Sequence, residues 1–247
     1  MFKIICIQGC NMKIIAVVGT KNTGKTTLVT KIVRELVERG FEVGTIKYSH
    51  HSFDMSDRDT GKHKKAGATI VAGTGKETFF TMDGGMELEN VLSMMEFIKN
   101  LDFVVLEGFK TSKYAKISTS DFKDEFTIAN VNVFEMESNE LKSLVDLISE
   151  RSFGMIKYLN CKKCGFDNCN DFVNQKIRGN NSASICKSES DEVLLKIDNQ
   201  MIPLNPFVRS FVKETILGMV KSLKTDEFGA SDFEKIELLI RDDHDTH

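Results

Sequence analysis

The first part of the chain alternates short apolar runs with longer amphipathic stretches. An apolar, β-branched run at residues 14–18 stops at Gly19 and predicts a buried strand. After it, apolar residues recur at helical spacing over residues 26–39, and Gly40 ends the pattern. Further strands are predicted at 41–47, 69–72, 77–81, 101–106, 115–118 and 126–132, and helices at 62–66, 87–100 and 139–150.

This alternation of strands and helices predicts an α/β fold with a mainly parallel sheet and helices on both faces. The pattern changes after about residue 153. There it predicts a hairpin at 193–197 and 200–203, a helix with Asn205 as N-cap and Pro206 in its first position, and a strand at 235–241. We therefore expect two domains, residues 12–152 and a smaller α+β module at 153–247.

The segment between the first strand and the first helix has the spacing of a phosphate-binding loop. Gly19-x4-Gly24-Lys25-Thr26 lets backbone N–H groups turn toward phosphate oxygens, and the dipole of the following helix favours an anion there. Lys25 is expected to reach the β- and γ-phosphates, and the Thr26 hydroxyl to bind Mg²⁺. This predicts a P-loop NTPase-type fold whose nucleotide-binding residues are Gly19, Asn22, Thr23, Gly24, Lys25, Thr26 and Thr27.

A P-loop also needs a carboxylate near the metal, usually at the end of a neighbouring buried strand. Glu107 ends the apolar run at 101–106 and is the candidate, with Lys110 either a phosphate contact or a solvated lysine. The polar segment at 48–60 is expected to cross the nucleotide site, where one of its aspartates would complete the Mg²⁺ shell. Zinc is a weaker interpretation of that segment, because the adjacent His50 and His51 point apart.

The composition and charge of the chain argue against several classes of function. The chain has 247 residues and a net charge of −3, which argues against a nucleic-acid or anionic-membrane partner. It has no apolar run of membrane-spanning length and no export signal, so we expect a cytoplasmic protein whose six cysteines are thiols or metal ligands rather than disulfides. Met12 is a second plausible start, and Cys6 and Cys10 before it show no ligand spacing.

The other four cysteines form the second strong pattern, Cys161-x2-Cys164-x4-Cys169-x16-Cys186. Four thiolates suit an iron–sulfur cluster or structural zinc. Three cysteines close together with a remote fourth favour the cluster, and zinc and free thiols remain alternatives. With Gly165 after the second cysteine, the segment resembles the [4Fe–4S] domain of corrinoid iron–sulfur proteins and some membrane redox subunits. Structural, electron-relay and oxygen-sensing roles are all open.

Several short motifs together resemble the MobB family: residues 19–27, 45–47 with His50-His51, 58–60, 66–68 and 107–110. The resemblance covers about residues 12–150. It implies a GTP-binding accessory protein with weak hydrolysis, which assists the enzyme that joins GMP to molybdopterin. It also implies Lys25, Glu107 and Asp59 as catalytic residues, with Thr26, Asp59 and Glu107 around Mg²⁺. Tyr48 departs from a common family histidine, and the guanine-reading Asn-Lys-x-Asp motif is absent from this half, so guanine preference rests on resemblance.

The leading hypothesis is therefore a GTP-binding accessory factor for molybdenum or tungsten pterin cofactor maturation, extended by a cluster domain. Its expected partners are the molybdopterin-guanylyl-transferring or cofactor-receiving enzyme and a second copy of the chain. The alternative is an ATP-driven redox activase. Nucleotide-gated reductases of this kind carry a lysine directly after the first glycine of the P-loop. This chain has Thr20 there and Lys21 one place later, which favours the GTP-binding hypothesis. A small-molecule kinase is a weaker third hypothesis.

Overall fold

The computed structural model describes residues 12–49, 59–180, 184–186, 193, 195–197, 200–202, 204–228 and 236. Cys6 and Cys10, the His- and Asp-rich segment at 50–58, and almost all of the strand predicted at 235–241 lie outside the described residues. Among the helices that are described, none combines the length and the apolar character needed to cross a membrane.

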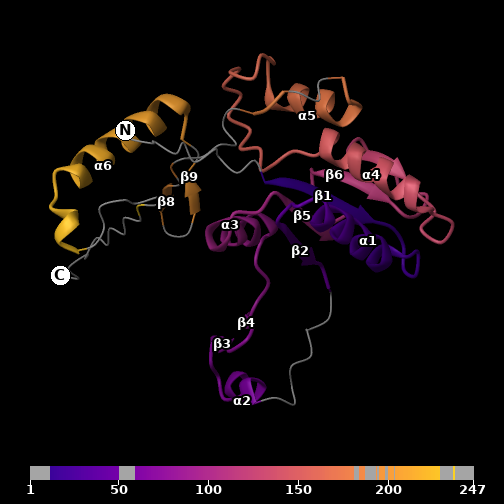
Figure 1. The fold of residues 1–247 in the computed structure, drawn as a ribbon, viewed down its shortest axis with the longest axis horizontal. Helices are drawn as coiled ribbons and strands as arrows, with labels where there is room; N and C mark the ends of the chain where they lie inside the picture. Colours follow the sequence, from indigo (N-terminus) through magenta and orange to yellow (C-terminus); the bar gives the residue numbers. More distant parts are fainter. Residues whose placement is uncertain are drawn as a thin grey trace.

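A five-stranded sheet forms the centre of the fold (Figure 1). Its order is β2-β5-β1-β6-β7, and every pairing within it is parallel. The strands are β1 (Lys13–Val18), β2 (Val43–Lys47), β5 (Phe103–Glu107), β6 (Ala115–Ser118) and β7 (Thr127–Asn130). The predicted parallel sheet is confirmed, with the strand before the phosphate loop at its centre.

Both faces of the central strands are covered. Successive residues of a strand point to opposite faces, yet residues 14–18 of β1 and 104–106 of β5 are all fully buried. Two helices that cover the sheet, α1 (Lys25–Glu38) and α4 (Ser138–Arg151), lie side by side. A third, α3 (Leu88–Ile98), packs over β2, where Gly44 leaves room for Met95.

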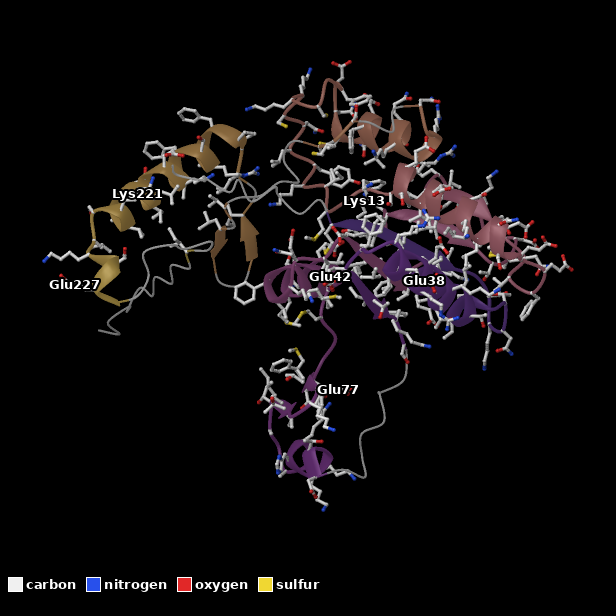
Figure 2. The ribbon with its side chains drawn as sticks, viewed as in Figure 1. Lys13, Glu38, Glu42, Glu77, Lys221 and Glu227 are labelled. Atoms are coloured by element: carbon white, nitrogen blue, oxygen red, sulfur yellow. The ribbon has the colours of Figure 1, made fainter. Side chains whose placement is uncertain are left out.

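A separate lobe leaves the sheet after β2. It consists of α2 (Asp59–Lys65) and an antiparallel hairpin of β3 (Ile70–Thr74) and β4 (Thr78–Met82). In Figure 2, Glu77 marks this lobe, well apart from Lys13 and Glu38 on the central domain. The two strands were predicted, but their separation from the main sheet was not. Ile70 and Phe80 on the hairpin are about 60% exposed.

The cysteine-rich region contains α5 (Cys169–Arg178), which packs against α4 and β7. Phe172, Val173 and Ile177 of α5 belong to the same apolar core as β1. Beyond it are β8 (Leu195–Ile197), β9 (Gln200–Ile202), α6 (Pro206–Lys221) and the short 3₁₀ helix η1 (Thr225–Phe228). The α6 N-terminus is as predicted: Pro206 is the first helical residue, and the Asn205 side chain accepts a hydrogen bond from the Val208 N–H.

Candidate functional site

The phosphate loop turns sharply between β1 and α1. Asn22 and Gly24 have left-handed backbone conformations (φ 63° and 83°), and α1 begins immediately afterwards at Lys25. A left-handed residue just before a helix directs consecutive N–H groups into one concavity, which is a ready anion site. Only glycine fits at position 19, because a Cβ there would clash with the Thr119 hydroxyl. The sequence pattern therefore folds into the geometry that its spacing predicts.

Three lysines give the loop a positive field. The Lys25 ammonium group donates to the carbonyl oxygen of Thr20. Burial lowers the pKa of Lys25 below its ordinary value; the Glu107 carboxylate opposes this shift, and the charges of Lys110 and Lys47 add to it. Like charges disfavour the protonated form, so an anion placed among these lysines would relieve their repulsion. The arrangement suits a polyphosphate.

The two predicted Mg²⁺ ligands of the central domain meet directly. The Thr26 hydroxyl donates to Glu107 Oε1 over 2.7 Å. Lys47 Nζ lies 3.0 Å from the same carboxylate oxygen, because Lys47 and Glu107 are register partners on β2 and β5. A hydroxyl and a carboxylate are the hard oxygen ligands that Mg²⁺ takes beside nucleotide phosphates. Their chemistry and their contact fit a metal held between them and a bound triphosphate.

Asp59 lies elsewhere. It is the first residue of α2 on the projecting lobe, its side chain is 88% exposed, and its carboxylate pairs with Lys62 Nζ over 2.8 Å. The structure does not bring Asp59 to Thr26 and Glu107. Most of the segment that was expected to cross the site, residues 50–58 with His50 and His51, lies outside the described residues. The role of Asp59 at the metal stays a prediction from family resemblance.

Sequence reasoning missed Thr119. Its hydroxyl shares a 2.6 Å hydrogen bond with the Thr23 hydroxyl and donates to the Val18 carbonyl oxygen over 3.2 Å. Thr119 directly follows β6, so it reaches the loop only because β6 lies next to β1. The available signal was its position: residues after parallel strands gather at the ligand-binding edge of the sheet.

A buried lysine fixes the neighbouring loops. Lys116 on β6 is 1% exposed; its ammonium group pairs with Asp124 and donates to the Lys110 carbonyl oxygen over 2.7 Å. The same charge lies 5.1 Å from the centre of the Phe126 ring. A buried charge persists when its partners satisfy it. Lys116 thus ties the loop that carries Lys110 to the loop after β6.

The four-cysteine segment supplies sulfur atoms that suit a metal centre, but these atoms do not form a closed ligand set. Cys169 and Cys186 are buried, and Cys161 and Cys164 are half-buried. The Asn160 N–H donates to Cys169 Sγ over 3.3 Å, and Asn160 Oδ1 accepts from the Cys169 N–H over 2.9 Å. Such N–H···S contacts accompany thiolate–metal centres.

No three His, Cys, Asp or Glu side chains among the described residues lie close enough together to hold a metal ion. The thiols therefore fit a metal centre in kind, and they would have to converge to close a ligand set. Gly165, beside the second cysteine, has φ 88° and open space where a Cβ would be. The predicted assignment of Cys161, Cys164, Cys169 and Cys186 as ligands stays a prediction.

Charged groups from three parts of the chain meet near Cys186. Burial, with the charge of Arg209 on α6, lowers the pKa of Lys157 to about 8, while Glu96 of α3 and Cys186 oppose the shift. Burial likewise raises the pKa of Glu96. Lys157, which precedes Cys161, therefore lies within the influence of charged groups on α3 and α6.

The parallel sheet, its central strand, the glycine loop and the helix that follows define a P-loop nucleotide-binding protein. Comparison with known families narrows this class. The chain belongs to the MobB family: the family model described as "Molybdopterin guanine dinucleotide synthesis protein B" matches residues 14–138. A second model, described as "Putative Fe-S cluster", matches residues 158–188.

Named relatives agree with this membership. A protein of Methanocaldococcus jannaschii, named "Putative molybdopterin-guanine dinucleotide biosynthesis adapter protein", is 30% identical over 224 residues, which is 86% of this chain and 92% of the relative. The molybdopterin-guanine dinucleotide biosynthesis adapter protein of Escherichia coli K12 is 30% identical over 56% of this chain and 91% of its own length. The crystal structure of Bacillus subtilis MobB aligns over 58% of this chain and its whole length, with 24% identity and a TM-score of 0.44.

The Thr26–Glu107 contact generates a test of the metal site. We predict that Glu107→Gln weakens nucleotide binding about tenfold in Mg²⁺, because it removes a charged ligand of the metal. Without metal, in EDTA, the affinity should stay equal or rise slightly, because one negative charge near the phosphates is gone. Calorimetric titration of a nucleoside triphosphate in both buffers measures this difference.

An equal loss in the two buffers would show that Glu107 does not act through the metal. Asp59→Asn is the matched comparison. A loss confined to Mg²⁺ buffer would support its family-based role, and an unchanged affinity in both buffers would show that this assignment is wrong.

Proposed function

We propose that this chain is a GTP-binding adapter in the biosynthesis of molybdopterin guanine dinucleotide, with weak GTPase activity and an appended iron–sulfur segment. One observation carries the proposal: within a MobB-family domain, the Thr26 hydroxyl and the Glu107 carboxylate meet at 2.7 Å beside the lysine of a phosphate loop. The match to the M. jannaschii protein, which extends over 86% of this chain, supports the same adapter role.

The nucleotide would lie along the loop with its triphosphate among Lys25, Lys47 and Lys110. Backbone N–H groups of residues 19–27 bind the phosphates, Lys25 neutralises the β- and γ-phosphate charge, and Thr26 and Glu107 hold Mg²⁺. Guanine as the base follows from the family. The proposed catalytic residues Lys25, Glu107 and Asp59 include no arginine to stabilise transition-state charge, so hydrolysis is slow.

The four cysteines would hold a [4Fe–4S] cluster, with a single zinc ion as the alternative. When bound, such a cluster supplies thiolate-ligated iron that exchanges electrons or braces the fold. The chain's own contribution is the buried pair Cys169 and Cys186, the Asn160 N–H that donates to Cys169 Sγ, and Cys161 and Cys164 nearby. Because the thiols must converge to close the ligand set, loading of the metal would order this segment.

The proposed partners are a second copy of the chain and the enzyme that transfers the guanylyl group or receives the cofactor. The hairpin of β3 and β4 supports dimer formation. It carries exposed Ile70 and Phe80 on a two-stranded sheet that projects from the domain. Two strands alone are marginal in water, and exposed apolar strands are surfaces that proteins usually cover.

Base preference tests the nucleotide part of this function. In competition against a fluorescent nucleotide at equal concentrations, we predict that GTP displaces the probe and ATP displaces it several-fold less. Lys25→Ala should abolish binding of both, because it removes the side chain placed to neutralise the β- and γ-phosphate charge. Lys142→Ala, an exposed lysine on α4, is the control and should bind as wild type. A clear preference for ATP would contradict the adapter function and favour the redox activase.

Metal content tests the cysteine segment. Protein purified without oxygen should be brown and absorb broadly at about 400 nm. It should contain about four iron atoms and four sulfide ions per chain. Serine at Cys161, Cys164, Cys169 or Cys186 should deplete the iron, while Cys6→Ser and Cys10→Ser serve as controls that leave it unchanged. A colourless protein with one tightly bound zinc would exclude the cluster.

A further inference from the structure

The two predicted metal ligands determine which way a bound nucleotide would run along the phosphate loop. Thr26 and Glu107 are the residues that would hold Mg²⁺ beside the terminal phosphates of a nucleoside triphosphate, so the γ-phosphate end would lie toward them. Glu107 ends β5, on one side of β1, and β6 and β7 lie on the other side. The nucleoside end must therefore point across the loop toward the segments that follow β6 and β7. This step rests on the nucleotide binding proposed above.

The segment after β7 is fixed against the phosphate loop. The Val131 N–H donates to the Ser118 carbonyl oxygen over 2.9 Å. Val133 is 3% exposed and packs so close to Gly24 that a Cβ on the glycine would lie 3.0 Å from the valine Cβ. Asn130 Nδ2 also donates to the Ser120 carbonyl oxygen over 2.5 Å. The turn after β7 thus has a set position beside the start of α1.

The same turn carries Phe134. Its N–H donates to Asn132 Oδ1 over 3.2 Å, and the Glu135 N–H donates to the Asn132 carbonyl oxygen over 3.4 Å. The Phe134 side chain follows buried Val133 directly, yet it is 77% exposed. The ring is therefore exposed on an anchored turn beside the start of α1, where a ligand bound along the phosphate loop could contact it.

We propose that Phe134 is the stacking platform for the purine base of the bound nucleotide. Phosphates on residues 19–27, the metal at Thr26 and Glu107, and the base over Phe134 would form one continuous site across the carboxyl edge of β5, β1, β6 and β7. Stacking on an aromatic face accepts any base, so Phe134 contributes affinity and leaves the choice of guanine to hydrogen-bonding groups around it.

Affinity for two ligands tests this placement. Phe134→Ala should weaken Mg²⁺–GTP binding about tenfold, as expected for the loss of one base–aromatic stack. It should leave the binding of inorganic tripolyphosphate with Mg²⁺ unchanged, because that ligand has no base. Phe134→Tyr should restore GTP affinity. Phe207→Ala is the matched control, since Phe207 on α6 is 78% exposed and should affect neither ligand.

A spectroscopic reporter gives an independent readout. The chain contains no tryptophan, so Phe134→Trp introduces a single tryptophan, whose emission can be excited selectively, on the turn. GTP should quench its emission by stacking, and tripolyphosphate should not. Phe207→Trp should respond to neither ligand.

The outcomes separate the two proposals. If wild-type protein binds neither GTP nor tripolyphosphate, the proposed nucleotide function is wrong, and the platform with it. If GTP binds in a Lys25-dependent manner but Phe134→Ala binds it within about twofold of wild type and Phe134→Trp is not quenched, the platform alone is overturned. In that case the exposed ring serves another purpose, such as contact with a partner protein.

Discussion

The parallel pairing of β1 with β5 is the constraint on which the site depends. It places Val17 opposite Glu107, so the carboxylate comes level with the end of β1 and within 2.7 Å of the Thr26 hydroxyl at the start of α1. Since side chains alternate between the faces of a strand, a slip of one residue would turn Glu107 to the other face. Close packing of the buried side chains on both faces resists such a slip, because a shifted register would change which side chains meet.

The surrounding charges follow from the same pairing. β2 continues the register outward and brings Lys47 to the Glu107 carboxylate. On the other side, β6 brings Thr119 to the Thr23 hydroxyl and Lys116 to the loop that carries Lys110. The site is therefore a product of sheet order: residues distant in sequence become neighbours because their strands end at one edge. The charges of Lys25, Lys47 and Lys110 make the surroundings of the loop positive, which suits the loop to bind a polyphosphate.

Much of this was predictable from local patterns. The phosphate loop, the buried strands and the candidate Glu107 are encoded in short stretches with a fixed chemical purpose. Thr119 and Lys47 could not be assigned roles, because their positions depend on which strands become neighbours. Asp59 was assigned by resemblance, and the structure places it on a lobe that the hydrophobic pattern gave no reason to separate. The four cysteines were recognisable by spacing, but spacing does not say how closely the four thiols approach one another in the fold.

The cysteine segment is joined to the nucleotide domain by packing as well as by sequence. Phe172 and Ile177 of α5 belong to the same apolar core as β1. The backbone of Ile14 also pairs with that of Phe153, which precedes the four cysteines in the chain. Lys157 lies in the combined field of Glu96, Arg209 and Cys186. These contacts join the cysteine segment to the domain that carries the phosphate loop.

A double-mutant cycle with Thr26→Ala and Glu107→Gln measures whether Thr26 and Glu107 share one metal ion, because two ligands of one metal must be energetically coupled. GTP affinity would be measured for wild type, both single variants and the double variant, in Mg²⁺ and in EDTA. The account predicts a coupling energy in Mg²⁺ that exceeds the value in EDTA by about 1 kcal/mol or more. Effects that add within about 0.5 kcal/mol in both buffers would contradict a metal shared by Thr26 and Glu107.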